Sequence, residues 1–203
     1  MRRVFAVAGL GVAALLIATG CGSAATDSPP NTGTRPPATS AASAHNAADV
    51  AFAQQMIPHH RQAISMAELA SSRAASPKVR DLASQIKKDQ SSEIATMTNW
   101  LQTWHAAPAG NDPGQGSAMG GMNRAAMAGM MSNQQMSQLA NTSGPAFDRL
   151  FLQRMIAHHE GAVQMATTER ATGQNTDAQN LATAIQRSQT AQIATMRQLL
   201  AGH

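Results

Sequence analysis

The chain contains one long internal repeat. Residues 49–101 align with residues 148–200 at a constant offset of 99 positions without a gap, and 19 of the 53 aligned pairs are identical. A repeat of this length is a supersecondary unit that cannot bury its apolar face alone, so the two copies must pack against each other. The fold is therefore expected to consist of two similar units related by a pseudo-twofold axis.

Each copy has the periodicity of two helices. In the first copy, apolar residues recur at three- and four-residue steps from Phe52 through Met56, and a second stripe of this kind begins at Leu82 and Ile86. This spacing places apolar side chains on one face of an α-helix. The sequence predicts an all-α fold, an antiparallel four-helix bundle made of two repeated helical hairpins, which spans residues 46–203.

A long Met-rich crossover, residues 105–144, joins the two hairpins. It shows little periodicity until Ser132 and Gln135, which predict a capping box that opens a short helix. Earlier thioethers in this stretch have few apolar neighbours, which makes them candidate accessory ligands for a soft metal ion; the alternative is that some of them dock the short helix on the bundle. These candidates are Met119, Met122, Met127, Met130 and Met131.

The first 45 residues are typical of an export signal followed by a tether. Two arginines precede an uncharged apolar run that ends in Ala18-Thr19-Gly20-Cys21, which resembles the bacterial lipobox. Residues 1–20 are therefore predicted to be a lipoprotein signal peptide and Cys21 its lipidation site. Residues 21–45 are rich in Ser, Thr, Ala, Gly and Pro and are predicted to be a disordered tether. We expect a lipid-anchored location on the extracytoplasmic side of the cell membrane, with plain secretion as the alternative.

A His-His dipeptide occurs at the same place in both copies, and methionines lie three residues before and six residues after each pair. Adjacent residues of a helix are about 100° apart, so both imidazoles of a pair can border the buried stripe. A pseudo-twofold bundle would bring the two clusters toward each other in its interior. The predicted metal ligands are His59, His60, His158, His159, Met56, Met66, Met155 and Met165.

Imidazole and thioether donors without a thiolate favour copper, as Cu(I) or Cu(II). A carboxylate-bridged di-iron bundle needs Glu-x-x-His motifs, and the chain has none. His158-His159-Glu160 is similar to the start of a hemerythrin-type site, but the remaining spacing is absent. The single cysteine, Cys21, excludes a disulfide framework and a zinc site made of cysteines alone.

Polar residues occupy matching places on the second helix of each copy. Gln90, Glu93, Gln189 and Gln192 could bond the imidazoles across the bundle. They would then fix the tautomers of metal ligands, or, alternatively, belong to a structural polar network in which methionine only fills the core. Asp49 and Asp148 are expected to begin their helices, where the helix dipole favours a carboxylate.

Composition excludes several other functions. Only 13% of residues are charged and the formal net charge is +4, too little for a nucleic-acid-binding surface. The chain has no catalytic Ser/His/Asp order and no glycine-rich phosphate loop. No nucleic acid partner is expected, and no particular protein partner is indicated. An enzymatic role is not favoured, although a copper- or iron-dependent redox enzyme stays a weaker alternative.

The doubled motif resembles the bacterial family known as domain of unknown function 305. That pattern, Asp, Phe, Met-Ile-x-His-His-x-x-Ala-x-x-Met-Ala and then Gln-x-x-Glu-Ile-x-x-Met, fits residues 49–67 and 90–97, and again 148–166 and 189–196. The second copy departs from it at Gln192, where the pattern has Glu. The resemblance implies a ferritin-like helical bundle in exported proteins, some of them similar to periplasmic copper-binding proteins associated with copper tolerance.

Together, these features predict an extracytoplasmic lipoprotein that binds copper through paired His and Met and buffers or sequesters it at the membrane surface. The alternative is a metal-free cell-envelope interaction module in which the buried His pairs are structural.

Overall fold

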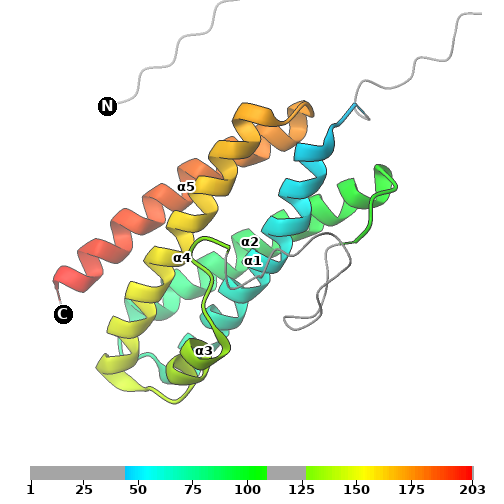
Figure 1. Ribbon diagram of the computed structural model, residues 1–203. Helices are drawn as coiled ribbons and strands as arrows, with labels where there is room; N and C mark the ends of the chain where they lie inside the picture. Colours follow the sequence, from blue (N-terminus) through cyan, green and yellow to red (C-terminus); the bar gives the residue numbers. More distant parts are fainter. Residues whose placement is uncertain (1–43, 109–126, 203) are drawn as a thin grey trace, which may run out of the picture. The chain divides into compact units, whose positions relative to one another are not determined.

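The computed structural model describes residues 44–108 and 127–202, which form four long helices and one short helix (Figure 1). The first hairpin consists of α1 (Ala47–Arg73) and α2 (Pro77–Thr103), and the second of α4 (Gly144–Thr172) and α5 (Thr176–Ala201). Between them lies α3 (Asn133–Ala140), which begins with the predicted capping box of Ser132 and Gln135. The described residues contain no strand, and the predicted all-α bundle is confirmed.

Several predictions fall outside the described residues. These are the signal peptide, the lipidation site Cys21, the tether up to residue 43, and the crossover residues Met119 and Met122. Within 44–108 and 127–202, none of the helices combines the length and the apolar character that a membrane span requires.

The two hairpins pack together mainly through α1 and α4, whereas α2 and α5 lie farther apart and share few contacts. At the point where α2 and α5 do meet, Gln192 Nε2 donates a hydrogen bond to Asp89 Oδ2 at 3.4 Å. The α1–α4 contact therefore determines which residues lie at the centre of the molecule.

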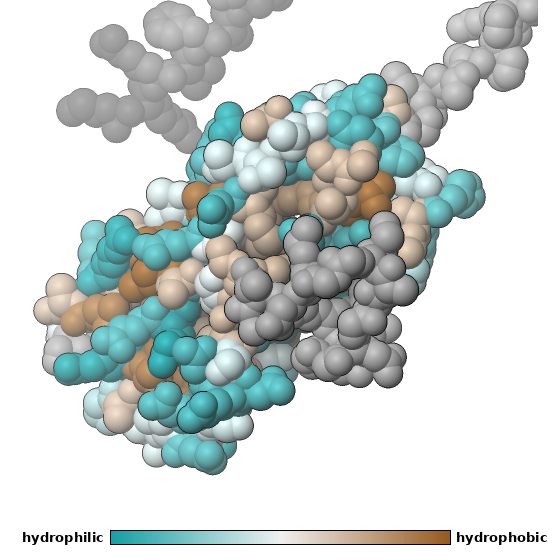
Figure 2. Space-filling view, in the orientation of Figure 1, coloured by the Kyte–Doolittle hydropathy of each residue, from teal (hydrophilic) through white to brown (hydrophobic). Residues whose placement is uncertain are grey.

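The apolar core is divided into two clusters, one toward each end of the α1–α4 pair. One cluster includes Phe147 and Phe151 from the start of α4, and the other includes Phe52 from the start of α1. The face shown in Figure 2 alternates hydrophilic residues with small hydrophobic patches, as expected when the apolar stripes of the helices face inward. A layer of polar residues, described below, lies between the two clusters.

Asp49 joins the two hairpins at one end of the bundle. Its carboxylate accepts the Asn46 N–H at 2.6 Å, as part of the capping box of α1. It also accepts the N–H groups of Gln174 at 3.1 Å and Asn175 at 2.9 Å, which belong to the turn between α4 and α5. The carboxylate of Asp49, which completes the capping box of α1, thus also fixes the turn of the second hairpin.

Asp148 makes the repeat-equivalent contact at the other end. It accepts the N–H groups of Ala75 at 3.1 Å and Ser76 at 2.8 Å, in the turn between α1 and α2. The expectation that Asp148 begins its helix is wrong, because α4 starts four residues earlier, at Gly144. Its carboxylate is instead fully buried against the other hairpin. The fold therefore uses both aspartates as reciprocal ties between the repeats.

Glu169 is a buried carboxyl group to which the sequence patterns assigned no role. It is only 1% exposed and lies beside Asp49, near the turn at Gly173. Burial, together with the neighbouring carboxylate of Asp49, raises the pKa of Glu169 to about 8. The first repeat has Ala70 at the matching position. The second repeat thus carries an acid in its folded core that is protonated at neutral pH.

Replacing Glu169 by the residue of the first repeat, Glu169→Ala, should change how stability depends on pH. Between the ordinary carboxyl pKa of 4.5 and about 8, the folded protein holds a proton that the unfolded chain has lost. Rising pH therefore favours unfolding in that range. Relative to the variant, the parent's free energy of unfolding, measured in urea, should decrease from pH 5 to pH 8.5.

The matched control is Glu160→Ala, because the Glu160 side chain is 52% exposed. The difference in unfolding free energy between that variant and the parent should stay nearly constant from pH 5 to pH 8.5. A constant difference for Glu169→Ala as well would contradict the raised pKa.

Candidate metal centre

The two His pairs lie at the centre of the α1–α4 contact. His59 and His60 come from α1, His158 and His159 come from α4, and all four side chains are fully buried. The rings of His59 and His158 are 3.8 Å apart between centroids, at an interplanar angle of 38°. The structure therefore brings imidazoles from both repeats into direct contact.

Three of the four imidazoles bond an acceptor through Nε2. His59 Nε2 lies 3.3 Å from the carbonyl oxygen of Ala128, and His60 Nε2 lies 2.6 Å from Oε2 of Glu93. His159 Nε2 lies 2.8 Å from Oε1 of Gln192, whose amide is oriented by the bond from its Nε2 to Asp89. Because these partners accept hydrogen bonds, Nε2 carries a proton in each ring, and Nδ1 keeps its lone pair in the neutral rings of His59 and His159.

These Nδ1 atoms have no hydrogen-bond partner among the described residues, although all three are buried. Neither ring nitrogen of His158 has a partner there either. A buried polar atom without a partner costs about 1–3 kcal/mol, so it requires an explanation. A ring nitrogen with a free lone pair is also the atom through which imidazole binds a transition metal.

Burial keeps His59, His158 and His159 uncharged. It lowers the pKa of His59 to about 3, with a further decrease from neighbouring His60, and the pKa of His159 to about 4 despite the bond to Gln192. Burial and the nearby His59 lower the pKa of His158 well below its usual value. Neutral imidazole is the form that ligates a metal, so no proton has to leave these rings first at neutral pH.

The second helices contribute polar residues at the places indicated by the repeat. Glu93 and Gln192 bond the imidazoles of His60 and His159, at equivalent positions of the two copies. Gln90 and Gln189 are each 2% exposed, and their side-chain amides have no partner among the described residues. The interior between the hairpins therefore contains further polar atoms that could accept or donate hydrogen bonds.

Methionines flank the imidazole layer on both sides. Met56 and Met97 belong to one apolar cluster, which Met165 also packs against, whereas Met66, Met155 and Met196 belong to the other. Met56, Met66 and Met155 are fully buried, and Met165 is half-buried. The arrangement follows from the antiparallel packing of α1 and α4, which sets the start of each helix beside the end of the other.

The described end of the crossover lies against the imidazole layer. Its Ala128 carbonyl bonds His59, as described above, and Met131 is buried while Met127 and Met130 are half-buried. Met131 belongs to the cluster that includes Leu139 of α3, so it packs with the core. Of the accessory candidates that the structure describes, Met127 and Met130 are the ones that remain partly exposed.

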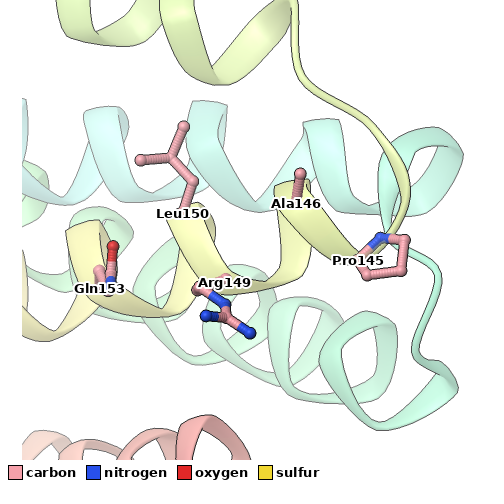
Figure 3. A pocket seen from close by; sticks show the side chains of 5 residues that line it. All are labelled: Pro145, Ala146, Arg149, Leu150 and Gln153. Atoms are coloured by element: carbon pink, nitrogen blue, oxygen red, sulfur yellow. The ribbon is translucent and has the colours of Figure 1, made fainter. Parts of the chain in front are cut away.

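The residues that the structure describes include no group of three or more His, Cys, Asp and Glu side chains arranged to hold a metal ion. An ion bound at the imidazole layer would therefore depend on the His pairs together with thioethers, which suits a soft ion. A surface hollow at the start of α4, lined by Pro145, Ala146, Arg149, Leu150 and Gln153, contains neither donor type (Figure 3). The candidate centre is thus an interior layer and not an open pocket.

Sequence patterns missed two residues that position this layer. The Ala128 carbonyl is a backbone group, and no residue-type pattern identifies it. Gln62, which holds the crossover in place as described below, occupies the repeat position of Gly161. Aligned positions next to the His dipeptides that differ between the two copies are the signal that could have identified Gln62.

The fold and the centre define an all-α bundle protein made of two helical hairpins with paired histidines buried between them. The family described as Domain of unknown function (DUF305) matches residues 49–200, and this chain belongs to it. No curated protein matches.

Among solved structures, the chain is similar to a "putative secreted protein DUF305 from Streptomyces coelicolor". The two are 30% identical, with 76% of this chain and 93% of that chain covered and a TM-score of 0.67. CopM is similar in its Cu(I)-bound and Ag-bound forms, each at 32% identity, 76% and 96% coverage and a TM-score of 0.62. The Cu(II)-bound form of CopM is 34% identical to this chain, with 76% of this chain and 96% of that chain covered and a TM-score of 0.63.

The two copies offer a natural comparison for the bond to each outer imidazole. Glu93→Gln places the residue of the second repeat opposite His60 and should cost less than about 1.5 kcal/mol, because an amide oxygen still accepts the Nε2–H. Glu93→Ala leaves that donor buried without a partner and should cost about 2 kcal/mol or more. Urea unfolding of the metal-free protein measures both.

The control is Glu68→Ala, which removes an exposed ion pair with Lys87. Such pairs contribute roughly 0–1 kcal/mol. If Glu93→Ala cost no more than this control, the bond between His60 and Glu93 would not stabilise the layer.

Proposed function

We propose that this chain binds copper in the interior of the bundle, with the contact between His59 and His158 as the central feature. The observation that carries the proposal is that these two rings, one from each repeat, contact each other with centroids 3.8 Å apart, and that three of their four nitrogens are buried without a partner among the described residues. In the other two imidazoles, those of His60 and His159, Nδ1 also has no partner within residues 44–108 and 127–202. Copper would be held as cargo by one lone-pair nitrogen from each ligating ring and by the flanking thioethers of Met56, Met66, Met155 and Met165.

The hydrogen bonds around the layer support this proposal. Metal-ligating histidines commonly donate their other N–H to a carboxylate, a backbone carbonyl or a similar acceptor, which orients the ring. Glu93, Ala128 and Gln192 supply one acceptor of each kind. The similarity to CopM, which has been solved with Cu(I), Cu(II) and Ag bound, favours copper or a similar soft ion.

We further propose that the chain buffers or sequesters copper outside the cytoplasm. In the part of the chain that the structure describes, the imidazoles are fully buried and the hollow at the start of α4 contains no imidazole or thioether, which fits holding an ion better than turning over a substrate. The alternative is a metal-free interaction module in which the same imidazoles serve as structural polar groups. The bonds of His59, His60 and His159 to protein acceptors fit both readings, whereas the unpaired nitrogens favour the metal.

Binding of Ag(I), a redox-inert substitute for Cu(I), tests this function directly. In the full chain, the paired substitution His59→Gln with His158→Gln should weaken Ag(I) affinity by at least about 100-fold, since loss of even an outer partner of a ligand costs 10–100-fold. Isothermal titration measures the affinity, and circular dichroism checks that the variant is folded. Cu(I) under reducing conditions should behave in the same way.

His105→Ala is the matched control, because His105 is exposed at the end of α2 and lies outside the imidazole layer. Its Ag(I) affinity should equal that of the parent. Absence of tight Ag(I) and Cu(I) binding in the parent, or unchanged affinity in the folded double variant, would favour the structural alternative.

We also propose that Cys21 is lipidated and tethers the bundle to the outer face of the cell membrane. The support is the small-residue run before Cys21, together with the name of the similar Streptomyces coelicolor protein as secreted. In a bacterial host, the full chain should partition into the detergent phase of a cell extract, and Cys21→Ala should move it to the aqueous phase. Equal partitioning of the two would rule out the anchor.

A further inference from the structure

We propose that residues 128–131 form a strap that closes the crossover side of the imidazole layer, and that Gln62 is the positioning residue that holds this strap down. A metal ion then reaches His59 and His158 only when the strap lifts. This inference rests on the proposed copper binding, because it assigns the route by which that centre is filled and emptied.

The side-chain amide of Gln62 binds the strap with both of its polar atoms. Gln62 Nε2 donates to the carbonyl oxygen of Met131 at 2.8 Å, and the Met131 N–H donates to Gln62 Oε1 at 2.7 Å. Two bonds to one residue fix both the position and the orientation of the backbone there. Gln62 lies on α1, one turn after His59, so it fastens the strap directly beside the imidazole layer.

Two glycines allow the backbone of the strap to approach α4 so closely that a side chain would not fit between them. A Cβ on Gly161 of α4 would collide with the carbonyl of Ala128, and a Cβ on Gly129 would collide with the carbonyl of Ala157 and lie 2.9 Å from the Cα of His158. Gly129 also has a φ of +81°, a backbone conformation that favours glycine. The strap is therefore in backbone contact with α4 at the His158 turn.

Gln62 and Gly161 occupy the same position of the two repeats. In the first copy this position supplies the amide that fastens the strap, and in the second it supplies the clearance that the strap needs. Because a single strap crosses the pseudo-twofold axis, its contacts with a position in the first repeat differ from its contacts with the equivalent position in the second repeat. This divergence is what an asymmetric cover over a symmetric pair of helices requires.

The strap also acts on the chemistry of the centre. The Ala128 carbonyl accepts the Nε2–H of His59 and so holds the tautomer in which Nδ1 is free to bind. All four imidazoles are fully buried. Lifting the strap would expose the rings of His59 and His158 and release the proton-bearing nitrogen of His59 from its partner.

Amide hydrogen exchange of the metal-free full chain tests the fastening. Gln62→Ala should speed exchange of the Met131 N–H by about tenfold, because two hydrogen bonds are lost. Gly161→Ala should speed it as well, although alanine favours the helix of α4 over glycine and so does not weaken that helix. Exchange of core amides in α1 and α4 should stay close to that of the parent.

Stopped-flow binding of Ag(I) tests the route. If the strap closes over the empty and the filled centre alike, its opening limits both directions. Gln62→Ala should then raise the association and dissociation rates by about tenfold each and change the equilibrium affinity by less than about threefold. A residue with only a structural role would change the affinity or the fold without this paired change in rates.

Gln54→Ala is the matched control. Gln54 is another α1 amide, and its Nε2 donates to the Ala107 carbonyl at 2.9 Å, after α2 and apart from the strap. Its loss should leave the Met131 exchange and the Ag(I) rates unchanged. Faster Met131 exchange with unchanged Ag(I) rates in Gln62→Ala and Gly161→Ala would overturn the strap as the route, and unchanged exchange would overturn its fastening. Absence of Ag(I) binding in the parent would instead overturn the proposed function.

Discussion

Four imidazoles lie buried between α1 and α4, and the hydrogen-bond requirements of three of them organise the rest of the molecule. A buried N–H without an acceptor is costly, so each proton-bearing Nε2 needs a partner from another segment. Glu93 of α2, Gln192 of α5 and the Ala128 carbonyl of the crossover supply these partners. The outer helices and the crossover are thus positioned by the same layer that the inner helices enclose. The apolar clusters on either side then exclude water, and burial keeps His59, His158 and His159 neutral.

The repeat separates the residues that build the frame from those that specialise it. Asp49 and Asp148 are identical in the two copies and tie each hairpin to the turn of the other. Where the copies differ, the structure becomes asymmetric. Gln62 fastens the strap whereas Gly161 makes room for it, and Glu169 places an acid where the first copy has alanine. A duplicated unit can keep its packing in this way while one side of the centre is covered and the other is bounded by the outer helices.

The fold could be predicted from the sequence because burial follows the side-chain pattern. Repeat, helical periodicity and the Ser132 capping box are all properties of residue types, and they predicted the hairpins and α3 correctly. The partners of His60 and His159 followed from the same logic, since a hairpin brings positions 33 residues apart face to face. The Ala128 carbonyl and the burial of Asp148 could not be predicted, because both depend on how segments distant in sequence pack. The raised pKa of Glu169 likewise depends on Asp49, which is far away along the chain.

The energetic cost of the imidazole layer is itself an argument for a ligand. An apolar layer of similar volume would pack between the two clusters without any polar atom to satisfy, and buried polar groups are often less stabilising than such a replacement. Most aligned pairs of the two copies differ, yet both copies keep the His-His dipeptide and the methionine three residues before it. Several ring nitrogens and two glutamine amides are nevertheless left unpaired in the described structure. A soft cation would satisfy the free lone pairs of the neutral rings, and the flanking thioethers would add donors that copper binds well. Without such a ligand, the buried unpaired nitrogens would lower the free energy of unfolding, whereas an apolar core would not.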